Sequence, residues 1–126
     1  MAESENINLI QRFCDAWASA DIPKIVDFFA DDAVYHNMPI QPVQGKDAIK
    51  GLIEQFMAPF ERAEFEITHI AESGNVVFTE RVDRFQTGGK KVELPVAGVF
   101  EIEGDKIVAW RDYFDMPTWT RQTTTP

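Results

Sequence analysis

Thr79-Glu80-Arg81-Val82-Asp83 is the stretch of sequence that decides the fold. It belongs to a longer run, residues 76–86, whose composition and alternation predict a β-strand. Side chains two positions apart on a strand point the same way, so Arg81 and Asp83 share a face. If this face is buried, two ionisable groups enter an apolar interior, which is unfavourable unless they are paired.

A second stretch also carries a charged residue that would need a partner if its face is buried. This stretch is Trp110-Arg111-Asp112-Tyr113-Phe114-Asp115. Asp112 is flanked on both sides, at two-residue spacing, by aromatic residues that share its face. We therefore expect Arg81 to lie between Asp83 and Asp112, in the order carboxylate, guanidinium, carboxylate. Two simpler interpretations stay open at this level: an ion pair that only stabilises the fold, or polar faces turned to water.

The second half of the chain has the pattern of an antiparallel sheet. Strands are predicted at residues 61–71, 76–86, 91–102 and 107–115, and tight glycine-containing turns separate them. Residues 116–126 are polar and rich in threonine, and they predict one helical turn around Trp119 followed by a frayed tail.

The first half has helical periodicity instead. Helices are expected at residues 4–19 and 46–57. A shorter helix between them is expected to begin at Asp21, with an apolar face that extends to Phe29. A short strand is expected at residues 33–37. The chain is thus expected to be one α+β domain, 1–126, with helices at about 4–57, a four-strand antiparallel meander at about 61–115 and a short tail at 116–126. A curved sheet wrapped around N-terminal helices makes a cone with one deep pocket.

The composition argues against several classes of partner. A net charge of −9 over 126 residues would repel nucleic acid and anionic membrane surfaces. No apolar run approaches the ~20 residues of a membrane span, and the start lacks a signal peptide's basic and apolar regions, so we expect a cytoplasmic protein. Cys14, the single cysteine, belongs to an apolar helical stripe and is expected in the core. His36 and His69 lack the spacing of a metal motif, so we expect no metal site.

The turns make a further prediction about strand pairing. With two-residue turns at 88–89 and 104–105, regular pairing would place Asp83 and Asp112 on opposite faces of the sheet. A slip of one residue reverses the facing of everything beyond it. If the charged residues meet, an irregularity must therefore lie between them, and we expect it within residues 98–105, because a glycine in a strand often marks a bulge.

Four motifs resemble the limonene-1,2-epoxide hydrolase family in their order and spacing. They are Tyr35-His36-Asn37-Met38-Pro39, Thr79-Glu80-Arg81-Val82-Asp83, Gly98-Val99-Phe100 and Trp110-Arg111-Asp112-Tyr113-Phe114-Asp115. The resemblance covers roughly residues 31–115. It implies a nuclear-transport-factor-like α+β cone, a homodimer, and the opening of epoxides by water without a metal or cofactor.

The same resemblance implies a role for each polar residue of the motifs. Asp83, Arg81 and Asp112 would form an Asp-Arg-Asp triad, with Asp112 as the base, Asp83 as the acid and Arg81 as the bridge, while Tyr35 and Asn37 would orient the water. Each positioned proton transfer is worth about 10²–10⁴-fold in rate. The expected partners are water and a small or medium hydrophobic epoxide. Candidate residues for the apolar wall of its pocket are Met38, Ile53, Phe85, Leu94, Val96 and Phe114.

Two other functions stay open. An isomerase or dehydratase on the same cone, similar to ketosteroid isomerase, would use a carboxylate to move a proton on carbon. A non-catalytic ligand-binding or dimerisation domain would use the charged residues only as an ion pair. The position of Arg81 between two carboxylates disfavours the isomerase.

Overall fold

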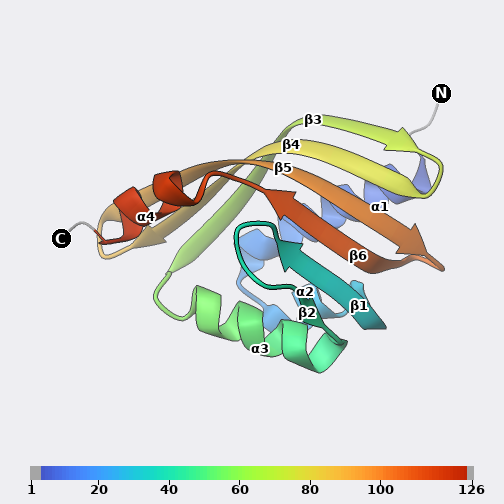
Figure 1. Cartoon of the computed structure of the whole chain (residues 1–126), viewed down its shortest axis with the longest axis horizontal. Helices are drawn as coiled ribbons and strands as arrows, with labels where there is room; N and C mark the ends of the chain where they lie inside the picture. Colours follow the sequence, from blue (N-terminus) through green and yellow to red (C-terminus); the bar gives the residue numbers. More distant parts are fainter. Residues whose placement is uncertain (1–3, 125–126) are drawn as a thin grey trace.

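The computed structural model describes residues 4–124 (Figure 1). As predicted, three helices precede the four-strand meander; β1 and β2 lie between the second and third of these helices, and α4 follows the last strand. No helix in this part of the chain is long and apolar enough to cross a membrane. The elements are α1 (Glu5–Ala16), the 3₁₀ turn η1 (Trp17–Ser19), α2 (Ile22–Val26), β1 (Phe29–Asn37), β2 (Val43–Gln44), α3 (Lys46–Met57), β3 (Arg62–Ser73), β4 (Val76–Thr87), β5 (Lys90–Glu103), β6 (Lys106–Tyr113) and α4 (Met116–Thr124).

A single six-stranded sheet has the strand order β2-β1-β6-β5-β4-β3. Strands β3 to β6 pair antiparallel with their neighbours in the chain, which confirms the predicted meander. The sheet has two strands beyond the four of the predicted meander: β1 joins β6 in parallel orientation, and β2, which lies in a segment without a predicted strand, pairs antiparallel with β1. Parallel neighbours need a long crossover connection, and everything from β2 to β5 lies between β1 and β6 in the chain.

The N-terminal helices begin at the residues that the sequence indicates. Ser4 caps α1 by accepting a hydrogen bond of 3.0 Å from a first-turn N–H, and Asp21 does the same for α2 at 3.2 Å. The prediction for the end of α2 was wrong, because the helix stops at Val26 and Phe29 begins β1. Phe29 is fully buried there, so core packing decides its conformation.

The core lies between the helices and the sheet. Cys14 is 1% exposed, as predicted, and burial raises the pKa of its thiol to about 12, so it is a neutral core residue. Phe13 on α1 occupies the centre of an aromatic cluster and is fully buried. Its ring packs edge-on against the rings of Trp17, Phe28, Phe29, Phe100 and Trp110.

The C-terminal segment forms more than the single helical turn predicted for it. Asp115 caps α4 by accepting a hydrogen bond of 3.0 Å from the Thr118 N–H, and the Gln122 side chain exchanges two hydrogen bonds with the backbone of Glu93 on β5. These contacts across to the sheet extend the helix to Thr124. The tail predicted to be frayed after one turn is therefore helical as far as Thr124, and its last two residues, 125–126, lie outside the described residues.

A β-bulge determines which face of β6 points toward the helices. The pairing of β5 with β6 shifts between Glu101 and Ile102, so that Gly98 lies opposite Asp112. The pairing of β4 with β5 is regular throughout. The irregularity therefore lies inside the predicted interval, and it turns Asp112 to the same face as Asp83.

Candidate active site

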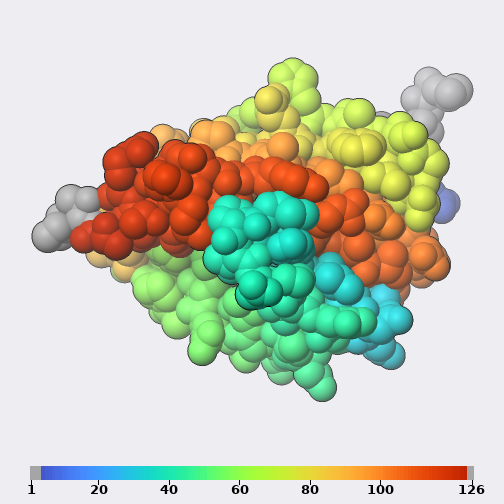
Figure 2. Space-filling model, in the orientation of Figure 1, coloured from blue at the N-terminus to red at the C-terminus, as the bar shows by residue number. Residues whose placement is uncertain are grey.

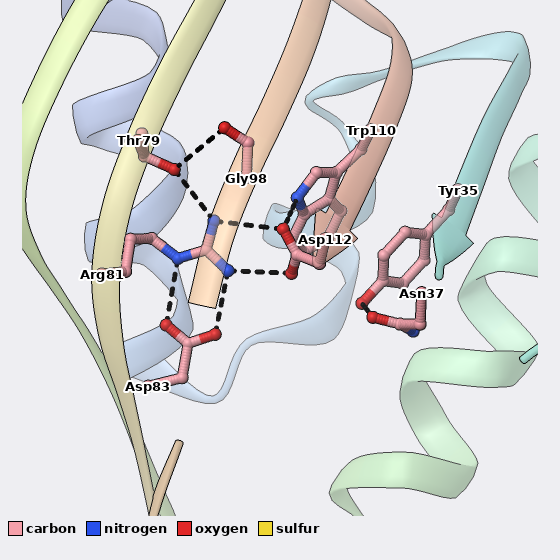
Figure 3. A network of polar contacts seen from close by, with 8 residues as sticks. All are labelled: Tyr35, Asn37, Thr79, Arg81, Asp83, Gly98, Trp110 and Asp112. Atoms are coloured by element: carbon pink, nitrogen blue, oxygen red, sulfur yellow. Dashed lines mark hydrogen bonds and ion pairs between the residues drawn. The ribbon is translucent and has the colours of Figure 1, made fainter. Parts of the chain in front are cut away.

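Arg81 on β4 lies between two carboxylates (Figure 3), and its side chain is 0% exposed. Its Nε and Nη2 donate to the two oxygens of Asp83 at 3.0 and 2.9 Å. Its Nη1 and Nη2 donate to the two oxygens of Asp112 at 3.2 and 2.8 Å. The structure thus brings together the three charged residues that the two sequence stretches predict.

Thr79 accepts the remaining hydrogen of the guanidinium. Nη1 of Arg81 donates to the Thr79 hydroxyl at 3.1 Å, and this hydroxyl donates to the Gly98 carbonyl at 3.4 Å. All five N–H groups of the arginine then have an acceptor, which is what a fully buried guanidinium requires. Sequence analysis did not assign Thr79 a role, although it lies two positions before Arg81 on the same face.

The two carboxylates have different environments. Asp112 accepts a third hydrogen bond, from the indole Nε1 of Trp110 at 2.6 Å, in addition to its two from Arg81. Within residues 4–124, Asp83 accepts the two bonds from Arg81 and no others. Asp112 thus has one hydrogen-bond donor more than Asp83.

Tyr35 and Asn37 reach this site through the parallel pairing of β1 with β6. Asn37 lies beside Asp112, and Tyr35 lies beside Trp110 with the two rings stacked at 4.1 Å. The Tyr35 hydroxyl donates to the Asn37 side-chain oxygen at 3.2 Å. Two residues predicted from the first half of the chain therefore lie at the Asp112 end of the charged cluster, as Figure 3 shows.

The pKa of Asp83 is raised from 3.8 to about 6. Burial is the largest cause, because it disfavours the charged form; Arg81 lowers the pKa and the charge of Asp112 raises it. Asp83 therefore keeps its proton in mildly acidic solution, unlike an ordinary aspartate. It has the property required of a proton donor.

Arg81 and Tyr35 both hold their protons. Burial disfavours the charged arginine, but the charges of Asp112 and Asp83 outweigh this effect and hold its pKa well above the usual value. Burial, followed by the charge of Asp112, raises the pKa of the Tyr35 hydroxyl. The site thus contains a permanent cation and a neutral tyrosine that can donate and accept hydrogen bonds.

The two carboxylates line a pocket of about 130 Å³ whose other lining residues are mostly apolar. Five of the six predicted wall residues line it: Ile53, Phe85, Leu94, Val96 and Phe114. Met38 does not. Because Tyr35 and Asn37 face the pocket, alternation turns the next residue away, and the backbone N–H of Met38 bonds to the Asp112 carbonyl at 2.9 Å.

The pocket has further wall residues that the sequence analysis did not predict. Figure 2 shows the segment after β1, in teal, next to the red segment around α4, and both contribute to the lining. Trp119 on α4 packs within 6.0 Å of three phenylalanine rings, those of Phe56, Phe60 and Phe85. The additional lining residues are Trp17, Ile40, Leu52, Phe56, Phe65, Met116 and Trp119.

Neither histidine lies along this pocket. His36 contacts the Ile40 carbonyl at 2.9 Å, and His69 pairs with Glu80 at 2.8 Å on the surface. Within residues 4–124, no group of three or more histidine, cysteine, aspartate or glutamate residues is placed to hold a metal ion.

Solved structures of several proteins share this architecture. A SnoaL-like polyketide cyclase from Shewanella putrefaciens CN-32 superimposes with a TM-score of 0.84 at 16% identity, over 96% of this chain and 97% of that one. An NTF2-like protein from Burkholderia pseudomallei K96243 gives 0.86 at 19% identity, over 98% of this chain and 100% of that one. These likenesses show the fold alone: an NTF2-like α+β cone.

Sequence similarity identifies the family within this fold. The family model of the limonene-1,2-epoxide hydrolase catalytic domain matches residues 4–125. Epoxide hydrolase EphG of Mycobacterium tuberculosis is 31% identical over 109 residues, which is 85% of this chain and 71% of EphG. The structure of an M. tuberculosis LEH-like epoxide hydrolase has a TM-score of 0.79 at 31% identity, over 94% of this chain and 88% of that chain. The chain belongs to the limonene-1,2-epoxide hydrolase family, as its motifs predicted, and is an epoxide hydrolase.

Gly98 lies where a side chain would collide with the charged cluster. A Cβ at this position would lie 2.7 Å from Asp112 Oδ1 and 2.9 Å from Thr79 Oγ1, and would overlap Arg81 Nη1. We expect Gly98→Ala to lower the free energy of unfolding by about 1–3 kcal/mol and to slow epoxide hydrolysis, because buried groups held by hydrogen bonds must move. Urea denaturation and diol formation measure the two effects.

Gly51→Ala is the matched control. Gly51 lies in α3, and a Cβ there meets no atom within 4 Å. Alanine favours a helix over glycine by about 0.5–1 kcal/mol, so this variant should be as stable as the wild type or more so. A Gly98→Ala protein with wild-type stability and rate would show that the close packing at Gly98 is unimportant.

Proposed function

We propose that this protein adds water in one step to a small or medium hydrophobic epoxide, giving a vicinal diol without a covalent intermediate. The observation that supports the proposal is the buried guanidinium of Arg81, which joins two carboxylates of unequal environment in the lining of a mostly apolar pocket. Opening an epoxide needs a proton acceptor for water and a proton donor for the departing oxygen. Asp112 and Asp83 supply the two groups from opposite sides of one cation.

In this proposal Asp112 activates the water. The Trp110 indole and Arg81 donate hydrogen bonds to its carboxylate, and in the proposed step this carboxylate accepts a proton from the water. The Tyr35 hydroxyl and the Asn37 side chain lie on this side of the site and can hold the water by hydrogen bonds. Fixing the water beside its base converts an encounter in solution into a step within one complex.

Asp83 protonates the epoxide oxygen. Its proton moves to that oxygen as the carbon–oxygen bond breaks, while the water oxygen bonds to the carbon and releases a proton to Asp112. After one turnover Asp83 is ionised and Asp112 is protonated, so one proton must return from Asp112 to Asp83 before the next. The cycle then consumes only epoxide and water.

The apolar wall favours a substrate with a hydrocarbon body. Aromatic and aliphatic side chains surround the space above the two carboxylates, and Arg81 itself does not line the pocket. An anionic substrate group would have to lose its water there and would face carboxylates, with no cation in the lining to pair with it. We therefore propose that the substrate carries no negative charge.

Single-turnover hydrolysis in ¹⁸O-labelled water tests the reaction. The purified protein is to be offered a panel of terpene, cycloalkene, styrene and fatty-acid epoxides. We expect one labelled oxygen in the diol of the first turnover, because solvent water attacks the carbon directly. An enzyme with a covalent aspartyl ester would transfer its own carboxylate oxygen first, so unlabelled diol would refute the one-step reaction.

Removal of either carboxylate tests the assigned roles. Asp83→Asn and Asp112→Asn should each lower kcat by about 10²-fold or more, and the double variant should be little worse than either single one, because the pair works as a unit. The matched control is Asp105→Asn in an exposed turn, which should keep the wild-type rate. A single triad variant that retains more than about a tenth of that rate would contradict the role of the residue.

The pKa of Asp83 predicts a pH dependence. A pKa raised from 3.8 to about 6 means that the carboxyl is protonated below about pH 6 and ionised above it. If this proton opens the epoxide, kcat/KM should fall about tenfold per pH unit above this midpoint, because it reports the free enzyme. The folded protein also binds the extra proton, so the same group favours folding most below about pH 4 and loses that contribution as the pH rises through about 6. A flat profile of kcat/KM from pH 5 to 8 would contradict Asp83 as the acid.

A further inference from the structure

The indole N–H of Trp17 has no hydrogen-bond partner. Trp17 is 1% exposed, and among the described residues its Nε1 is the one buried side-chain nitrogen or oxygen atom found without an acceptor or donor. A buried donor left unpaired costs about 1–3 kcal/mol. A phenylalanine could fill much of the same space without this cost, so the unpaired N–H calls for an explanation.

Trp17 lines the pocket that contains the two carboxylates. Four other polar side chains that line the pocket have partners within the protein: Tyr35 bonds to Asn37, and both Asp83 and Asp112 bond to Arg81. The pocket also contains the indole of Trp119, but among the described residues only the Trp17 N–H is both fully buried and without an acceptor.

The Trp17 ring packs against a neighbour of each carboxylate. It stacks on Phe65 at 4.6 Å with an interplanar angle of 18°, and Phe65 on β3 is the pairing partner of Asp83 on β4, so the two point to the same face. It also lies edge-on to Trp110, whose indole bonds to Asp112, at 6.0 Å. The closer of these two contacts is the one beside Asp83, the proposed proton donor.

We propose that Trp17 is a catalytic residue of this enzyme and that its indole N–H is a second hydrogen-bond donor to the epoxide oxygen. It donates a hydrogen bond to this oxygen while Asp83 transfers its proton, and it stabilises the negative charge that develops as the carbon–oxygen bond breaks. No additional proton moves, since the indole keeps its hydrogen. The inference depends on the hydrolysis proposed above and adds a residue that sequence analysis did not single out.

The charge on the oxygen is greatest in the transition state, so this hydrogen bond should act mainly on kcat. One donor to an oxyanion is worth roughly 10²–10³-fold in enzymes. Here Asp83 neutralises part of the charge by protonation, and we expect a smaller effect of roughly 10- to 100-fold.

Trp17→Phe tests the inference in the full-length protein. This change keeps an aromatic ring against Phe65 and removes the donor. We expect kcat for styrene oxide and for a cycloalkene oxide to fall roughly 10- to 100-fold while KM changes less than about threefold. The midpoint of the kcat/KM profile should stay near the Asp83 pKa of about 6, because Asp83 keeps its place. A midpoint that moves would show that Trp17 acts only by positioning Asp83 and would overturn the proposal.

Trp119→Phe is the matched control. It removes the same ring area and an N–H from the same pocket, but in the aromatic cluster with Phe56, Phe60 and Phe85. This variant should raise KM, because the apolar wall is altered, and should lower kcat much less than Trp17→Phe does. Equal losses of kcat in both variants would assign the effect to packing.

Replacement of Trp17 by benzothienylalanine separates the donor from the size of the ring. A sulfur atom takes the place of the N–H, so the outline of the side chain is kept even if Trp17→Phe folds poorly. The loss of kcat should match that predicted for Trp17→Phe. Wild-type kcat in this protein would overturn the inference alone, whereas a wild-type chain that forms no diol from any epoxide would overturn the proposed reaction as well.

Discussion

A buried guanidinium must keep its charge and find an acceptor for each of its five N–H groups, and much of this structure follows from that requirement. Arg81 is out of contact with water, so no solvent can complete an unfinished arrangement. Two carboxylates and one hydroxyl satisfy it. With one carboxyl protonated, the cluster is electrically neutral, which is the least costly state for charges in an apolar surrounding. The same neutrality leaves one proton available for chemistry.

This requirement extends into the backbone. Asp112 reaches Arg81 only because the pairing of β5 with β6 is interrupted by a bulge. The strand between them can carry no side chain where the three polar groups meet, and Gly98 occupies that position. Parallel pairing of β1 then places Tyr35 and Asn37 beside the cluster. A bulge, a glycine and a strand orientation that look like separate irregularities therefore serve one arrangement of charges.

The sequence predicted the structure correctly where the period of a strand or helix determines which way a side chain points. Two-residue alternation placed Arg81 and Asp83 on one face. Counting from the turns showed that Asp112 can meet them only through an irregular pairing, and the bulge lies within the predicted residues 98–105. Prediction from the sequence failed where distant segments decide the outcome. The parallel pairing of β1, the length of α4 and the facing of Met38 depend on contacts across the molecule. The unpaired N–H of Trp17 could not be predicted either, because a missing partner is visible only when all neighbours are in place.

The pairing of β1 with β6 also bears on how the site forms. Asn37 and Asp112 lie far apart in the chain, with the entire meander between them, yet they are neighbours in the sheet. Contacts of this separation are entropically expensive to close and tend to form late in folding. Chains in which only the local hairpins have formed would hold Asp83 beside Arg81 but would lack the wall that carries Tyr35. The complete set of site residues would then come together only late in folding.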